Sequence, residues 1–407
     1  MRIVLLALAC AFQPLWGGGG LTVERIFHPT EAETFVETRT STPLWRPDGT
    51  LLLERRDKGG FKVLDRREGA GTAPVLTRSR LQEQLAAAGI APADIQAGLS
   101  APFTWNGART AFLVQAGAAL VLADAGGAPA RRLAEGDSPA FSPDGAWVAY
   151  LEGNDVRALE LATGRVVKVT TGGGPTRLNG RLDWVYQEEV FNERGVWRGF
   201  WWSPDSRRIA FLSLDESPVP VFTLADDRTQ PQKLTRLAYP KAGDPVPLPR
   251  LGVADLEGRV DWVEDPYPGQ EVFVPRVGWD PKGRLLAHWT DRTQTWLECR
   301  VHEGAGPGRV LVREAQPRGW VEHLPLPRFL KDGRFLWLSS RTGNSHLYLC
   351  DGRTQVPVTS GPWDVKRLLG VDEKGGLAWF EGTRRSPVGV DAYRVPLAGG
   401  APELLTP

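Results

Sequence analysis

The stretch Phe141–Glu152, FSPDGAWVAYLE, combines an aromatic residue, a tight turn and a short apolar strand. Within the turn, Pro143 fixes its own φ, Asp144 hydrogen-bonds to nearby backbone, and Gly145 tolerates a positive φ. The stretch therefore predicts a tight turn that leads directly into a β-strand.

The more general pattern of a bulky residue, a tight turn and a short apolar strand occurs seven times along the chain. The other six copies lie at Trp45–Gly49, Trp105–Gly107, Trp202–Ser206, Trp279–Gly283, Leu330–Gly333 and Asp372–Gly375. Successive turns are between 38 residues (Gly107 to Gly145) and 77 residues (Ser206 to Gly283) apart. A four-stranded propeller blade takes about 40–45 residues, so the short intervals fit bare blades and the long ones carry insertions. We predict an all-β fold, a β-propeller of four-stranded blades, with about seven blades visible in the sequence and short helical insertions.

The composition agrees with many short strands joined by turns. The 407 residues include 46 glycines and 33 prolines, and 42% of the chain is hydrophobic. Glycine and proline favour turns, while the apolar content excludes a disordered chain. The net charge is only +1, so no basic surface points to nucleic acid as a partner.

The N-terminal residues indicate export. MRIVLLALACAF has one early arginine and then an apolar segment of the length found in secretory signals. We expect a signal peptide over residues 1–20, a propeller over 21–407, and a periplasmic or extracellular protein, with lipidation of Cys10 as an alternative anchor. With three cysteines the chain has no disulfide scaffold, and whether Cys299 and Cys350 pair stays open.

Two stretches depart from the repeating pattern. Residues 80–99 are rich in Ala, Leu and Gln, and they predict one or two short helices in a surface insertion, with Pro92 ending the first. Residues 181–191, RLDWVYQEEVF, place apolar side chains at helical spacing. We predict a short helix there, with Asp183 as its cap.

Glu188 and Glu189 lie on this predicted helix. Adjacent α-helical residues point about 100° apart, so the pair does not ordinarily share a face, and a solvated acidic surface is the simpler interpretation. Two converging carboxylates would instead repel one another unless a cation lies between them, which makes such a pair a receptor for an ammonium group. No histidine lies nearby in the sequence, so metal binding has little support.

The motif Asp183–Phe191, DWVYQEEVF, followed by Trp201–Asp205, WWSPD, closely resembles the dipeptidyl peptidase IV family of prolyl oligopeptidase-type serine peptidases. Further matches follow in the family's order at Leu214–Glu216 with Val219–Pro220, Tyr239–Gly243, Gly319–Val321, His346–Leu349 and Gly361–Val365. The resemblance covers nearly the whole chain after residue 20.

The resemblance implies an eight-bladed propeller that covers an α/β-hydrolase domain. It implies that Glu188 and Glu189 hold the free N-terminal amine of a peptide substrate, while Gln187 replaces an acidic residue of some members and lowers the local charge. Arg109 is the nearest counterpart of a family arginine that contacts the substrate carbonyl, although its surroundings match poorly. The segment 236–248 resembles an arm that family members use to form homodimers.

The sequence also departs from the family. It stops at Pro407 and contains no Gly-x-Ser-x-Gly motif, so we expect the hydrolase domain and every catalytic residue to be absent. Ser345 and His346 are adjacent, which is not triad geometry, and we interpret all five histidines as structural or surface residues. With seven turn signals where the family has eight blades, closure of the ring is doubtful.

We therefore expect the substrate-recognition and gating propeller of a dipeptidyl-peptidase-like serine peptidase, with no metal or cofactor and no peptidase activity of its own. Its partners would be peptide N-termini and a separate α/β-hydrolase domain or chain. The residues leave one alternative open, a non-catalytic secreted propeller that binds peptides or proteins.

Overall fold

The structure is a computed structural model that describes residues 22, 23, 27, 41–56, 62–68, 71–322 and 324–406. The predicted signal peptide and Cys10 lie outside these residues, as do His28 and His323. Within the described part, no helix is both long enough and apolar enough to cross a membrane.

Seven antiparallel sheets follow one another along the described chain, six with four strands and one with five. The first sheet contains β1 (Ser41–Trp45), β2 (Leu51–Arg56), β3 (Lys62–Glu68) and β4 (Gly71–Leu76). The second contains β5 (Thr104–Trp105), β6 (Ala111–Ala116), β7 (Ala119–Asp124) and β8 (Arg131–Glu135), and the third contains β9 (Asp137–Phe141), β10 (Trp147–Glu152), β11 (Asp155–Glu160) and β12 (Val166–Lys168).

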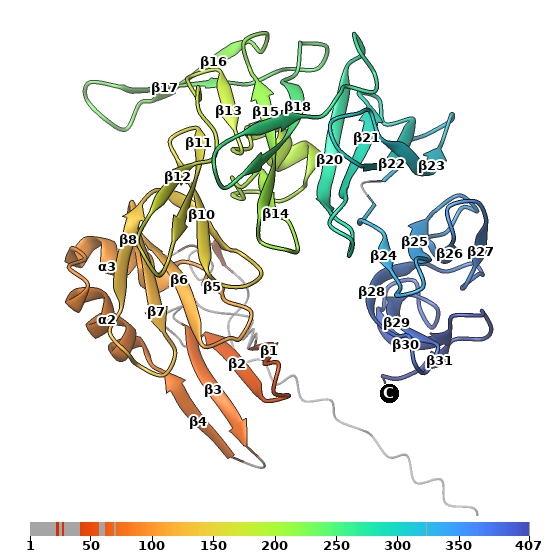
Figure 1. Ribbon diagram of the computed structural model, residues 1–407, viewed down its shortest axis with the longest axis horizontal. Coiled ribbons are helices and arrows are strands. Elements are labelled where there is room, and N and C mark those ends of the chain that lie inside the picture. Colours follow the sequence, from red (N-terminus) through yellow and green to blue (C-terminus); the bar gives the residue numbers. More distant parts are fainter. Residues whose placement is uncertain are drawn as a thin grey trace, which may run out of the picture.

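The fourth sheet carries the fifth strand. It contains β13 (Arg177–Asn179), β14 (Phe200–Trp202), β15 (Arg208–Asp215), β18 (Leu248–Asp255) and β19 (Val260–Trp262), and both β13 and β14 pair with β15. A separate hairpin, β16 (Val221–Asp226) with β17 (Lys233–Ala238), projects from it between β15 and β18 (Figure 1).

The last three sheets have the plain four-stranded order. They contain β20 (Val272–Trp279), β21 (Leu285–Asp291), β22 (Trp296–His302) and β23 (Arg309–Ala315); then β24 (Arg328–Phe329), β25 (Phe335–Ser339), β26 (His346–Cys350) and β27 (Gln355–Pro357); and finally β28 (Val365–Asp372), β29 (Leu377–Gly382), β30 (Asp391–Pro396) and β31 (Glu403–Leu404).

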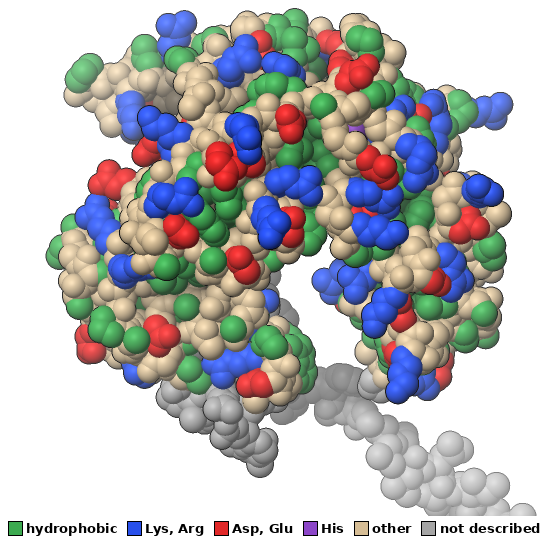
Figure 2. All heavy atoms as spheres, in the orientation of Figure 1, with side chains coloured by type: hydrophobic (Ala, Val, Ile, Leu, Met, Phe, Trp, Pro, Cys, Tyr) green, Lys and Arg blue, Asp and Glu red, His purple; other side chains and the backbone are tan. Residues whose placement is uncertain are grey.

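The sheets are arranged around a central space in chain order (Figure 1). The first sheet and the last sheet lie on either side of an opening in this arc, and the opening persists when all heavy atoms are drawn (Figure 2). The all-β prediction of a propeller with four-stranded blades is confirmed. Seven blades are present in the described residues, as many as the turn signals that predicted them.

The quoted turn has the geometry that its residues predict. Gly145 has φ 74°, and the Asp144 carboxylate accepts hydrogen bonds from the Ser142 hydroxyl at 2.5 Å and the Ala146 amide at 3.0 Å. In the neighbouring blade Ser206 takes the glycine position at φ 62°, and its hydroxyl accepts a bond from the Asp144 amide at 3.0 Å. This bond between blades gives a physical reason for a serine where most copies have glycine.

In two copies of the motif the tryptophan before the turn also joins neighbouring blades. The indole N–H of Trp202 donates to the carbonyl of Ala140 at 3.2 Å, and that of Trp279 donates to the carbonyl of Trp201 at 3.1 Å. The first bond joins β14 to β9, and the second joins β20 to β14, so each links two successive sheets. In these two copies the motif therefore supplies both the turn within a blade and a contact to the preceding blade.

The predicted helical insertion forms two helices, α2 (Arg78–Ala87) and α3 (Pro92–Ser100). Pro92 does not end the first helix, which stops at Ala87, but begins the second, where its missing N–H costs no hydrogen bond. Leu85 and Leu99 are buried against β6 and β7. The insertion is thus part of the core of the second blade as well as of the surface.

Cys299 and Cys350, whose pairing the sequence left open, do not form a disulfide with each other. Both are free and buried in one hydrophobic cluster between the fifth and sixth blades. Burial raises the pKa of the Cys299 thiol, so it serves as an apolar core residue there.

Candidate functional site

The helix predicted within residues 181–191 is present, but most of it is a π-helix and not an α-helix. The Asp183 carboxylate accepts hydrogen bonds from the amides of Val185 and Tyr186, both at 3.0 Å, so it caps the start as predicted. The chain then widens into a π-helical turn, η1 (Tyr186–Val190), closed by the bond from the Phe191 amide to the Tyr186 carbonyl at 2.8 Å. A π-turn contains more residues than an α-turn, so neighbouring side chains diverge less.

Tyr186 anchors this turn to the next blade. Its ring is completely buried and lies near Phe191 and Phe273, with centroid distances of 6.1 and 6.0 Å. Its hydroxyl accepts a hydrogen bond from the amide of Val274 in β20 at 3.3 Å. The π-turn is therefore held by the aromatic side chain that its own sequence supplies.

Gln187 faces the protein interior and not the solvent. Its amide nitrogen donates to the carbonyls of Leu182 at 3.4 Å and Asp183 at 3.2 Å, and its amide oxygen accepts from the Gly195 amide at 3.2 Å. Only 4% of Gln187 is exposed. The structure gives Gln187 a structural role, because it joins the π-turn to the loop that follows.

Glu188 and Glu189 both line one cavity of about 570 Å³, which we call the acidic cavity. The carboxylate of Glu188 is partly buried and pairs with the guanidinium of Arg194 at 2.9 Å, whereas Glu189 is exposed. Both members of the adjacent pair, carried by the π-turn, therefore line the same cavity. The other lining residues are Phe191, Asn192, Glu193, Arg276, Gln294, Trp320 and Glu322.

The acidic cavity is named for its charge. Its lining holds four carboxylates and a single guanidinium, that of Arg276. Arg276 lies 5.4 Å from the centre of the Phe191 ring, and burial lowers the pKa of its guanidinium while the Glu193 carboxylate opposes that shift. The indole of Trp320 is 65% exposed and donates to Glu322 at 3.1 Å, so an aromatic face and carboxylates lie together. This combination suits an organic cation.

Two residues of the lining have unusual backbone geometry. Asn192 has φ 55° and Gln294 has φ 58°, in the left-handed region that non-glycine residues rarely adopt. Such residues cost free energy and are concentrated at functional sites. The lining is therefore a place where the fold tolerates strain.

A second pair of carboxyl groups lies behind the π-turn. Burial raises the pKa of Asp183 to about 6, against the lowering effect of its backbone hydrogen bonds. Burial, together with the Asp183 carboxylate, raises the pKa of Glu216 to about 7. The carboxyl group that caps the π-turn and the neighbouring Glu216 thus both have raised pKa values.

Arg109 is not brought together with the glutamates. It lies in the turn between β5 and β6 with φ 57°, and its backbone carbonyl accepts a bond from the Arg46 guanidinium at 3.5 Å. His346 is buried, with its ring nitrogens 3.1 Å from the Thr359 hydroxyl and 2.9 Å from the Gly361 carbonyl. Its neighbour Ser345 donates its backbone amide to Asp364, as expected of a turn residue.

The sequence did not indicate the part of the acidic cavity that distant segments supply. Arg276, Gln294 and Glu322 come from separate loops and strands, and no local pattern connects them to the π-turn, whereas Glu193 follows Glu189 by only four residues. Trp320 belongs to the Gly319–Val321 match, which was the one available signal.

The comparisons with known proteins agree with this fold. The family described as "Dipeptidyl peptidase IV (DPP IV) N-terminal region" matches residues 123–407. "Probable dipeptidyl-aminopeptidase B" of Emericella nidulans is 30% identical over 291 residues, covering 64% of this chain and 32% of that protein. "Dipeptidyl peptidase 4" of Arthroderma otae is 28% identical over 255 residues, covering 58% and 32%. The chain thus spans about a third of the length of the curated relatives it matches.

A solved structure is similar over nearly all of the chain. It is described as "Crystal structure of Porphyromonas gingivalis dipeptidyl peptidase 4", with a TM-score of 0.77 and 23% identity over 96% of this chain and 56% of that one. At this identity the likeness establishes the fold.

Proposed function

The chain belongs to the family of dipeptidyl peptidase IV N-terminal regions, and from that premise we propose that its propeller recognises peptides for a dipeptidyl-peptidase-type proteolysis. In this proposal Glu188 and Glu189 anchor the free N-terminal ammonium of the peptide in the acidic cavity. The observation that carries the proposal is the convergence of four carboxylates and an exposed indole on one cavity.

The cavity chemistry supports an ammonium ligand. Carboxylates that face one another without a cation repel, and an ammonium donates three hydrogen bonds that satisfy several of them at once. The Arg194 guanidinium that pairs with Glu188 is 87% exposed, so its displacement by a ligand costs little. A volume of about 570 Å³ lies in the range of small-ligand sites, roughly 300–1,000 Å³.

Anchoring of the amine would set the position of cleavage. When the N-terminus is held at a fixed point, only the bond a set distance from it reaches a nucleophile, and such positioning lowers the barrier. In this proposal the nucleophile belongs to an α/β-hydrolase domain or chain, and the propeller gates its access to peptides.

The hairpin of β16 and β17 provides the proposed dimer contact, together with the adjoining segment 236–248. Apolar side chains on it are exposed, including Val221 at 57%, Leu224 at 51% and Leu234 at 61%. Exposed apolar groups on a projecting hairpin are typical of an interface. We propose that a second copy of the chain covers them.

The amine-anchoring role is tested with the double variant E188Q/E189Q. Trialanine, with a free N-terminus, is titrated into the protein by isothermal calorimetry. Charge-assisted hydrogen bonds contribute about 1.5–3 kcal/mol each, so we expect the variant to lose at least about tenfold in affinity. The matched control is E257Q/E303Q, which neutralises two exposed glutamates on turns elsewhere, and it should bind like the wild type. Equal affinity of all three proteins would refute the role.

A further inference from the structure

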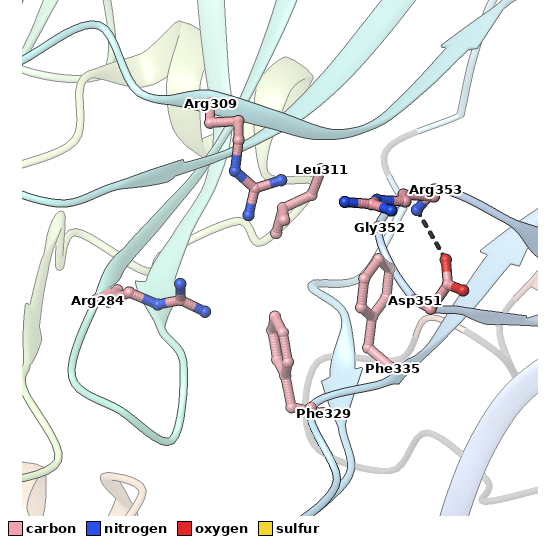
Figure 3. A pocket seen from close by; sticks show the side chains of 9 residues that line it. Arg284, Arg309, Leu311, Phe329, Phe335, Asp351, Gly352 and Arg353 are labelled. Atoms are coloured by element: carbon pink, nitrogen blue, oxygen red, sulfur yellow. Dashed lines mark hydrogen bonds between the residues drawn. The ribbon is translucent and has the colours of Figure 1, made fainter.

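A second cavity, of about 390 Å³, lies between the fifth and sixth blades (Figure 3). We call it the arginine pocket, because the guanidinium groups of Arg284, Arg309 and Arg353 line it. Arg284 follows the turn between β20 and β21, Arg309 begins β23, and Arg353 lies in the turn between β26 and β27.

The arginine pocket lies on the opposite face of the propeller from the acidic cavity. In an antiparallel sheet successive turns alternate between its two ends. The β20–β21, β22–β23 and β26–β27 turns therefore share one face. The β21–β22 turn with Gln294 and the β23–β24 connection with Trp320, which line the acidic cavity, share the other. The arginine pocket is thus a separate site and does not depend on the proposed amine anchor.

The three arginines of the arginine pocket differ in their ion pairing. Arg284 is neutralised, since its Nε lies 2.7 Å from Asp280 and its Nη1 lies 3.0 Å from Glu303. Arg309 and Arg353 make no ion pair within the described part of the chain. Their side chains point into the same cavity as that of Arg284 (Figure 3).

The one carboxylate in the lining, that of Asp351, makes no ion pair with a guanidinium among the described residues. Both oxygens of Asp351 are used within its own turn, where they accept bonds from the Arg353 amide at 2.7 Å and from the Thr354 amide and hydroxyl at 2.6 and 2.9 Å. Figure 3 shows this carboxylate turned toward the backbone and away from the guanidinium groups. The guanidiniums of Arg309 and Arg353 thus face the cavity without an ion-pair partner among the described residues.

The remaining wall of the arginine pocket is apolar. Phe335 and Leu311 are buried, Phe329 is half-buried, and the two phenylalanine rings lie 5.3 Å apart between centroids. Figure 3 shows both rings beside the space into which the guanidiniums project. A ligand there would meet cations on one side and aromatic surface on the other.

We propose that the arginine pocket binds a small organic anion, with a phosphate, sulfate or carboxylate group carried on an aromatic or other apolar body. Guanidinium groups bind such oxyanions through paired N–H donors, and Arg309 and Arg353 supply them from two sides. The phenylalanine rings then bury the apolar body, which an inorganic ion lacks. A volume of about 390 Å³ accommodates a ligand of this size.

The test uses phenyl phosphate as the probe, titrated by calorimetry into the full chain at low salt. We expect binding in the millimolar range or tighter, with inorganic phosphate at least about tenfold weaker because it gains nothing from the rings. Phenol, which has no charge, should not bind measurably.

The double variant R309Q/R353Q should lower the affinity for phenyl phosphate at least about tenfold. The control R259Q/R334Q removes two exposed arginines that pair with acids in their own turns, and it should bind like the wild type. Thermal unfolding of both variants checks that they fold. Absence of phenyl phosphate binding to the wild type, or equal binding by R309Q/R353Q, would overturn the proposal.

Discussion

The buried amide of Gln187 gives a sharp test of how the π-turn is held. In the variant Q187E one carboxylate oxygen still accepts from the Gly195 amide. The other then faces the carbonyls of Leu182 and Asp183, to which the amide now donates. An ionised glutamate would leave a buried charge without a partner, at a cost of about 3–5 kcal/mol.

The variant can avoid that charge by taking up a proton. Keeping a glutamate protonated at pH 7 costs about 1.4 kcal/mol for each pH unit above its ordinary pKa of about 4.3, so about 3.7 kcal/mol. A protonated glutamate also has one N–H or O–H donor where the Gln187 amide has two. The lost hydrogen bond adds about 1 kcal/mol to the destabilisation. Either route lowers the free energy of unfolding by about 3–5 kcal/mol at pH 7.

The stability that Q187E loses relative to the wild type depends on pH and increases as the pH rises. The folded variant holds its proton more tightly than the unfolded chain, so its relative stability is highest below the unfolded pKa and falls as the pH rises. We expect the difference from the wild type to shrink to about 1 kcal/mol near pH 4.

Urea unfolding of wild type and Q187E at both pH values measures these differences. The matched control Q96E makes the same change at an exposed helical residue beside Arg78, and it should stay within about 0.5 kcal/mol of the wild type. A Q187E variant within about 1 kcal/mol of the wild type at pH 7 would show that the described hydrogen bonds do not hold the turn.

Three further predictions concern the support of the site and its assembly. The pKa of Glu216 is raised from its usual 4.5 to about 7, so the ionised group destabilises the fold at alkaline pH. E216Q should therefore melt higher than the wild type at about pH 8, with the gap vanishing near pH 4.5, and a gap independent of pH would contradict the burial beside Asp183. W202F should lose about 1 kcal/mol in urea unfolding, because it removes the bond between two blades. L234E should make the chain monomeric in analytical ultracentrifugation. The control V388E, at a more exposed apolar residue outside the hairpin, should leave the measured mass unchanged. A wild type that is already monomeric would contradict the dimer proposal.

The local features of the fold were predictable from the sequence because they rest on short-range chemistry. The turn at Pro143–Gly145 is fixed by its own residues, and Asp183 caps the helix that it precedes. The bond from Trp202 to the preceding blade was not predictable, although the tryptophan itself marked the repeat. The sequence shows which aromatic residue recurs but not which carbonyl it reaches.

Only the part of the candidate site that lies within one segment of the sequence was predictable. Glu188 and Glu189 stood out as a pair, but the helical spacing of the apolar residues did not distinguish the π-turn that carries them from an α-turn. The burial of Gln187 was missed for the same reason, since the widened turn decides which side chains face inward. Arg276 and Glu322 enter the cavity through packing of distant segments, which no spacing along the chain encodes.

The central claim is that the acidic cavity holds a peptide by its free amine. The most direct measurement compares trialanine with N-acetyl-trialanine in calorimetric titrations of the unmodified protein, since acetylation removes the ammonium charge and leaves the rest of the peptide. The account predicts that the free amine binds at least about tenfold more tightly. Equal affinity for the two peptides, or tighter binding of the acetylated one, would contradict it.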